Sequence, residues 1–303
     1  MSYCSLFELA SRLAEQLGFA FVADGADRLV NKDPEVASAF EREVEFAAKR
    51  EVFAAVPEVS LFLSVLQSLL RQGTVDLSLE LGKACDMGMN NMQVREVLDE
   101  VNDRYVVPAG LEITSHGLLR SFRFWTADEK ACYLAEVLTL MQDLSKLSPD
   151  VCLGYGGVLS FVRDGGLNPH DDDLDVLVGF DIGEVATFGA GVARLKEFLE
   201  SHGWIVCGQW PAFLKVNTRS MAADIDVFVA LDESGMLASI PGPRGKIPWA
   251  SVFPAGAIHV LDRDIAIPAD AEAYLGLVYG ADWKVPKRGW QHSWNYAAYQ
   301  DIT

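Results

Sequence analysis

The fold is decided by two runs of sequence, DDDLDVLV at residues 171–178 and DIDVFV at residues 224–229. Side chains alternate between the two faces of an extended strand, so Asp173 and Asp175 point one way while their apolar neighbours point the other. Asp226 likewise points away from the apolar residues on either side of it. If the two runs pair in one sheet, one face is apolar and the other gathers carboxylates from both strands.

Such a cluster of carboxylates repels itself unless a cation neutralises it or protons stay bound. Hard oxygen ligands of this kind suit Mg²⁺ or Mn²⁺. We therefore predict that Asp173, Asp175 and Asp226 bind the metal, with Asp171 and Asp224 in outer, supporting roles. A solvated acidic loop and an edge strand with a polar outer face are the alternatives. The apolar residues within both runs favour strands over a loop.

Further groups suited to a phosphorylated substrate flank the acidic runs. Gly156 and Gly157 lack side chains, so their backbone amides could approach a phosphate closely, although a tight turn alone would also explain them. Arg163 offers a planar fork of donors and Lys215 a point charge, and a salt bridge to the carboxylates is the alternative for each. Phosphoryl-type transfer depends on positioning and on neutralising anionic oxygens. Asp226 would complete the metal shell or take the proton from the attacking hydroxyl.

The whole chain has 303 residues, half of them hydrophobic, which suits a globular protein of two domains. Its formal net charge of −18 argues against nucleic acid as a partner and against electrostatic docking on an anionic membrane. Five scattered cysteines are typical of reduced thiols in a cytoplasm. No apolar stretch is long enough for a membrane span, so we expect no integral membrane segment.

The order of local signals predicts two different parts. Residues 1–122 are expected to form a mostly helical domain of unknown role, with an N-cap at Asp33 before Pro34 and a helix end at Gly73. Residues 123–303 mix strand and helix signals and are expected to form an α/β (α+β) domain with a mixed sheet. A capping box at residues 126–129 opens a long helix there, and only a helical turn is expected at residues 158–162.

Several ordered motifs resemble the LicD/fukutin-related family of the nucleotidyltransferase-fold superfamily. The strongest is GGVLSFVRDGGLNPHDDDLD at residues 156–175, followed by IDVF at residues 225–228 and YGADWKVP at residues 279–286. The resemblance covers roughly residues 125–290. The family usually has tryptophan where this chain has His170, which bears on how a donor or acceptor stacks. The N-terminal helical part has no counterpart in the resemblance.

The resemblance implies a nucleotidyltransferase-like fold and a metal-dependent transferase acting in cell-surface polysaccharide biosynthesis. Its substrates would be a CDP-linked or other nucleotide donor and a glycan or small-molecule acceptor. The group transferred would be a phosphorylated alcohol, similar to phosphocholine or a polyol phosphate. One alternative is a nucleotidyltransferase that moves a nucleoside monophosphate from a triphosphate to a small molecule or protein. Another is a non-catalytic protein whose acidic strands bind metal or regulate an assembly.

Overall fold

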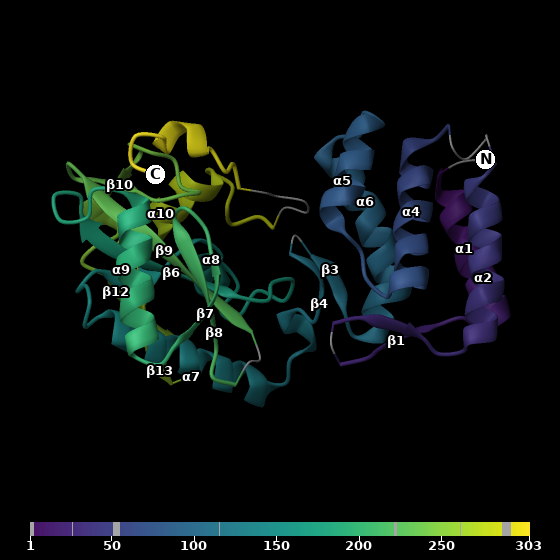
Figure 1. The fold of residues 1–303 in the computed structure, drawn as a ribbon, viewed down its shortest axis with the longest axis horizontal. Coiled ribbons are helices and arrows are strands. Elements are labelled where there is room, and N and C mark those ends of the chain that lie inside the picture. Colours follow the sequence, from purple (N-terminus) through teal and green to yellow (C-terminus); the bar gives the residue numbers. More distant parts are fainter. Residues whose placement is uncertain are drawn as a thin grey trace. The chain divides into compact units, whose positions relative to one another are not determined.

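The computed structural model describes residues 3–25, 27–50, 55–114, 116–220, 223–260, 262–286 and 292–303. They form two compact units, one extending to Phe124 and the other beginning at Trp125 (Figure 1). Among the helices in these ranges, none has both the length and the apolar character that crossing a bilayer requires.

The N-terminal unit contains the helix ends predicted from the sequence. The Asp33 side chain accepts hydrogen bonds from two backbone N–H groups at the start of α2, and Gly73 ends α4 with a φ of 70°. In the core, the rings of Phe7 and Phe62 lie 4.4 Å apart. The helices are α1 (Tyr3–Leu17), α2 (Pro34–Ala48), α4 (Pro57–Gln72), α5 (Leu77–Asp86) and α6 (Asn91–Val101), and the short helices are η1 (Asn102–Val106), η2 (Val107–Ala109) and η3 (Phe122–Phe124). The described part of this unit also contains two hairpins. One pairs β1 (Phe21–Ala23) with β2 (Leu29–Asn31), and the other pairs β3 (Glu112–Thr114) with β4 (Gly117–Leu119).

The second unit is built on a mixed seven-stranded sheet, as the alternating strand and helix signals predict. The strands are β5 (Val151–Leu153), β6 (Leu174–Asp181), β7 (Ile205–Gln209), β8 (Phe213–Asn217), β9 (Asp224–Glu233), β10 (Met236–Ala238) and β11 (Ile247–Pro248). β6 and β9 run parallel, and the other pairings in this sheet are antiparallel. Along one edge of β9, its first half pairs with β8 and its last residues pair with β10.

Helices pack against both faces of this sheet. α9 (Phe188–Ser201) lies on the face of Val229, because a Cβ on Gly191 would lie only 2.7 Å from a methyl carbon of Val229 (Figure 1). α8 (Tyr155–Arg163) lies on the opposite face, where the rings of Tyr155 and Phe228 are 5.0 Å apart. α10 (Ala271–Tyr279) packs behind α8 through Tyr274, which is fully buried.

The remaining elements of this unit largely follow the sequence signals. The reciprocal hydrogen bonds between Thr126 and Glu129 confirm the capping box, which begins α7 (Ala127–Leu144). Strand signals at residues 258–261 and 265–267, on either side of residues 262–264, predict a hairpin. It is present as β12 (Gly256–Val260) and β13 (Arg263–Ile267). The single helical turn predicted at residues 158–162 was too short, since α8 has nine residues and begins at Tyr155. Short helices η4 (Trp249–Ser251) and η5 (Tyr296–Tyr299) complete the unit.

Candidate active site

The two acidic strands lie side by side in the sheet. β6 and β9 pair in parallel with Asp175 directly opposite Asp226. On its other side, Asp226 is opposite Lys215 of β8. Because alternate residues of a strand share a face, these side chains lie on the same face as Phe228, the face that α8 covers. The parallel register therefore brings together carboxylates that are 51 positions apart in the chain.

Lys215 forms ion pairs with carboxylates from both acidic runs. Its Nζ lies 2.9 Å from Oδ2 of Asp173 and 2.9 Å from Oδ1 of Asp226. Burial lowers the pKa of the Lys215 ammonium, but the negative charges of the two aspartates outweigh burial and the net pKa is raised. The salt bridge that the sequence left open as an alternative for Lys215 is thus present, and its contact with a phosphate stays a prediction.

The glycine pair lies in the first turn of α8 and not in a tight turn before it. Gly154 is the N-cap, and the residue with positive φ is Tyr155, at 35°. The Gly156 N–H donates a hydrogen bond of 2.8 Å to Oδ2 of Asp175. A Cβ on Gly156 would lie 3.1 Å from that oxygen and 3.3 Å from Oδ2 of Asp171, so glycine makes room for two carboxylates. The helix N-terminus, which carries a partial positive charge, is therefore directed at the acidic cluster.

The carboxyl group of Asp175 is buried among other negative charges. Burial raises its pKa well above the usual aspartate value, and the charges of Asp173, Asp226 and Asp171 raise it further. The hydrogen bond from Gly156 offsets only part of this effect. One ammonium, that of Lys215, does not balance four neighbouring carboxylates, so the site favours either a bound proton or an added cation.

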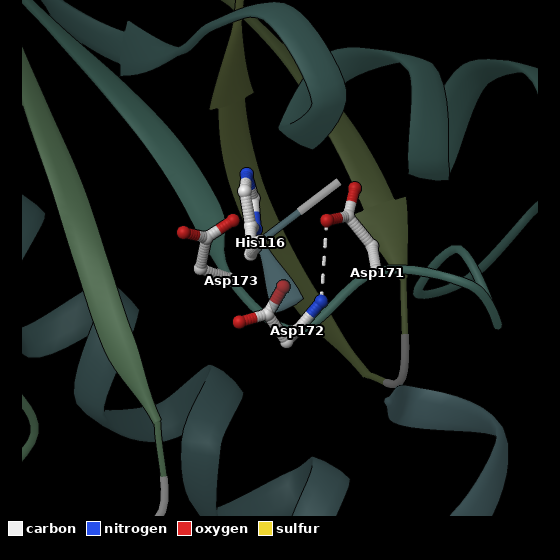
Figure 2. A group of neighbouring side chains, drawn as sticks. All are labelled: His116, Asp171, Asp172 and Asp173. Carbon is white, nitrogen blue, oxygen red and sulfur yellow. Dashed lines mark hydrogen bonds between the residues drawn. The ribbon is translucent and has the colours of Figure 1, made fainter. Parts of the chain in front are cut away.

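The loop that leads into β6 adds further carboxylate oxygens. One oxygen from each of Asp171, Asp172 and Asp173 lies within 4.8 Å of the others, and the Asp172 N–H donates to Oδ1 of Asp171 at 3.2 Å (Figure 2). Dense, partly buried oxygen donors are the ligands that Mg²⁺ and Mn²⁺ prefer. Of the predicted metal ligands, Asp173 belongs to this group. Metal binding by Asp175 and Asp226 stays a prediction, as does the outer role predicted for Asp171.

Other residues named from the sequence are engaged elsewhere. Arg163 donates two hydrogen bonds of 2.7 Å to the carboxylate of Asp164, so its predicted contact with a phosphate stays a prediction. The Asp224 side chain accepts a hydrogen bond from the Asn217 amide. His170 is exposed on the loop before the acidic run, and its backbone N–H donates to Asn168.

Tyr133 of α7 is a structural support of the site that sequence reasoning missed. Its hydroxyl donates to the backbone carbonyl of Asp224 at 2.8 Å and accepts from the backbone N–H of Leu174 at 2.8 Å. It therefore joins the first residues of β9 and β6, next to Asp226 and Asp175. The capping box indicated this helix from the sequence, but an apolar helical pattern does not show that the hydroxyl of its tyrosine binds backbone groups.

We expect Tyr133→Phe to lower the free energy of unfolding by about 1–3 kcal/mol, because it leaves two buried backbone groups without their partner. Metal affinity should fall as well, since the starts of both acidic strands lose their common support. Urea unfolding and Mn²⁺ titration would measure the two effects. The partly exposed Tyr296, outside the sheet, provides the control Tyr296→Phe, and equal stability of the two variants would contradict the prediction.

A group of aromatic side chains lies beside the carboxylates. From the sequence, Tyr279 at the end of α10 is expected to pack this helix against the core, with stacking on a base as the alternative. Burial and the charges of Asp175 and Asp171 together raise its pKa well above the usual tyrosine value. The His292 ring lies 5.1 Å from that of Tyr279 and 5.5 Å from that of Tyr155. Burial lowers the pKa of His292 to about 4, so its ring is neutral at pH 7.

Comparison with known proteins gives only distant likenesses. No protein-family model and no curated protein sequence matches the chain. A structure of the antibiotic-resistance factor ANT(2'')-Ia is 15% identical over 57% of this chain and 83% of its own, with a TM-score of 0.34. The lincosamide antibiotic adenylyltransferase LnuA, with lincomycin bound, is 18% identical over 50% of this chain and 84% of its own, with a TM-score of 0.31. The RNA terminal uridylyl transferase Cid1 is 22% identical over 35% and 32%, with a TM-score of 0.25.

The names of these structures describe nucleotidyl transfer by those proteins, and none of them mentions a CDP-linked alcohol. The LicD/fukutin-related resemblance has no matching family model to support it. At these TM-scores the likenesses assign no activity to this chain, so its function has to be argued from its own site.

Proposed function

We propose that this protein is a metal-dependent transferase that moves a nucleoside monophosphate from a nucleoside triphosphate to a hydroxyl group of a small molecule or protein. The observation that carries the proposal is the strand register that sets Asp175 opposite Asp226. Lys215 joins Asp173 to the same cluster, because it forms ion pairs with both Asp173 and Asp226. Bound there, a divalent ion would neutralise the donor phosphates and stabilise the charge that develops on them.

The chain's own groups have distinct roles in this proposal. Asp173 and Asp175 would hold the cation, Asp226 would either complete its shell or serve as the base, and the N-terminal turn of α8 keeps Asp175 in place through Gly156. The acceptor hydroxyl loses its proton to a carboxylate of the cluster as it attacks the α-phosphorus, and diphosphate leaves. Asp226 is the candidate for this base.

The electrostatics of the site make a phosphorylated donor depend on the cation. The two basic side chains predicted to bind phosphate are held by carboxylates, Lys215 by Asp173 and Asp226 and Arg163 by Asp164. Neutralisation of the donor phosphates would therefore come from the cation, for a triphosphate and for a CDP-linked donor alike. Transfer of a phosphorylated alcohol from a CDP-linked donor is the second candidate, favoured by the sequence motifs and by the same carboxylates.

Product masses separate the two candidates. The protein would be incubated with Mn²⁺ and either nucleoside triphosphates or CDP-choline, together with sugar and polyol acceptors. We expect nucleotide-dependent release of diphosphate and an acceptor, or the protein itself, heavier by one nucleoside monophosphate. Release of CMP and addition of phosphocholine would support the second candidate. A metal-binding scaffold would show neither product and no gain in thermal stability with nucleotide, whereas a bound ligand at a hundredfold excess over its Kd adds about 2.7 kcal/mol.

A further inference from the structure

Two exposed tryptophans gather around one phenylalanine in the second unit. Trp210 and Trp294 are 41% and 46% exposed, which is unusual for side chains with so much apolar surface. The ring of Trp210 is parallel to that of Phe213, with centroids 4.6 Å apart, and the ring of Trp294 lies 5.9 Å from Phe213. Phe213 in turn stacks on Phe228 at 4.6 Å. Inner rings thus support two indoles that face solvent.

This aromatic group lies on the face of the sheet that carries the carboxylates. Phe213 and Lys215 are two residues apart on β8, and Phe228 and Asp226 are two apart on β9, so each pair shares a face. The surroundings of Gly208 in β7 show that the Trp210 ring lies on this face as well. A Cβ there would lie 3.3 Å from Cβ of Lys215 and 2.5 Å from a ring carbon of Trp210, so the indole covers the bare glycine beside Lys215.

The hairpin between β7 and β8 holds the indole in this position. The backbone N–H of Trp210 donates to the backbone carbonyl of Phe213 at 2.9 Å. The backbone N–H of Val229 donates to the backbone carbonyl of Ala212 at 2.9 Å. Pro211 restricts the turn between them. The ring therefore presents a supported, flat apolar surface to solvent.

The distance from this surface to the carboxylates suits a nucleotide. Two residues along a strand correspond to a rise of about 6.6 Å, so Phe213 and Phe228 lie about that far from Lys215 and Asp226 along the sheet. One ribose separates a nucleobase from its first phosphate by a comparable span. With the phosphates at the acidic cluster, the base of the same molecule reaches the aromatic group.

We propose that Trp210, assisted by Trp294, forms a stacking platform for the nucleobase of the donor. This inference rests on the proposed function and adds the place of the base to it. An aromatic face stacks on any base, so the platform contributes affinity with little choice among the four bases. It acts without charge, which suits a protein whose net charge of −18 repels the phosphates of its donor.

The test compares nucleotides with a base-free probe. Binding of ATP, CTP and inorganic tripolyphosphate, each with Mg²⁺, would be measured calorimetrically for the wild type, Trp210→Ala and Trp210→Phe. We expect Trp210→Ala to weaken nucleotide binding about 5- to 150-fold and to leave tripolyphosphate binding unchanged. Trp210→Phe should restore most of the loss. Ile205→Ala removes another exposed apolar side chain of β7 and should change nothing.

The outcomes distinguish the platform from the proposed function. The platform is rejected, while the metal site stands, if Trp210→Ala binds nucleotides as the wild type does. It is also rejected if the substitution weakens tripolyphosphate binding as much as nucleotide binding. If the wild type binds neither tripolyphosphate nor nucleotide with Mg²⁺, the proposed function fails and the platform fails with it. An unfolding curve for each variant shows whether a loss of nucleotide binding reflects misfolding. If Trp210→Ala is misfolded, nucleotide binding by Trp210→Phe decides whether the platform exists.

Discussion

Asp175→Asn is expected to abolish turnover and, in the absence of divalent ions, to raise the thermal stability of the protein. Turnover should fall on the order of 10³-fold or more, because a metal's stabilisation of transition-state charge is worth several kcal/mol. Asparagine has nearly the same shape and can still accept the Gly156 hydrogen bond. The variant therefore removes a charge and changes little else.

The gain in stability follows from the raised pKa of Asp175. Burial and the neighbouring carboxylates raise this pKa in the folded protein above its unfolded value of about 3.9. Folding then favours the protonated form of Asp175, which contributes to the free energy of unfolding. This contribution is complete below the unfolded pKa and is lost as pH rises through the folded pKa. At neutral pH the metal-free wild type should therefore be less stable than Asp175→Asn, and the difference should shrink in acid.

Unfolding midpoints with a chelator and with Mn²⁺, at acid and neutral pH, would measure this effect. Mn²⁺ should stabilise the wild type and have little effect on Asp175→Asn. Asp181→Asn is the matched control, because Asp181 ends the same strand at an exposed position. A variant with full turnover, or one less stable than the wild type without metal, would show that Asp175 is not a strained metal ligand.

The sequence was sufficient to predict the acidic face of the sheet. Strand alternation and apolar flanks indicated which aspartates point together. The parallel pairing that sets Asp175 opposite Asp226 was not predicted, because two strands in one sheet can also pair antiparallel or in another register. Helix caps such as Asp33 and Thr126 were predictable because their hydrogen bonds join residues close in sequence.

Contacts between distant elements were less visible in the sequence. A tight turn was one interpretation of the glycine pair, because glycine is the residue that most readily adopts a positive φ. In the structure the positive φ belongs to Tyr155, a residue type that rarely adopts it. Nothing in the sequence pointed to Tyr133, because its hydroxyl contacts depend on how α7 is placed against the sheet. The ion pairs of Lys215 required the register of β8, which its own sequence does not determine.

Lys215→Met is expected to separate two roles that the sequence allowed for this residue. In the wild type the ammonium contacts Oδ2 of Asp173 and Oδ1 of Asp226, two carboxylates that are 7% and 13% exposed. Removing one partner of a buried ion pair leaves the others uncompensated, which costs about 3 kcal/mol. The metal-free variant should therefore unfold at lower urea concentration. Lys246→Met, at an exposed loop position, should stay within about 0.5 kcal/mol of the wild type.

Metal binding decides between the two roles of Lys215. The ammonium and a divalent ion use the same carboxylates, so an ion that binds the wild type has to share or displace the lysine. If Lys215 is the counter-ion of the empty cluster, Lys215→Met should bind Mn²⁺ more tightly than the wild type, and Mn²⁺ should restore its stability. If Lys215 instead serves only to bind the donor phosphates, Mn²⁺ affinity should be unchanged while nucleotide affinity falls. Tighter Mn²⁺ binding together with lost turnover would indicate that one lysine first balances the carboxylates and then, once released by the ion, contacts the donor.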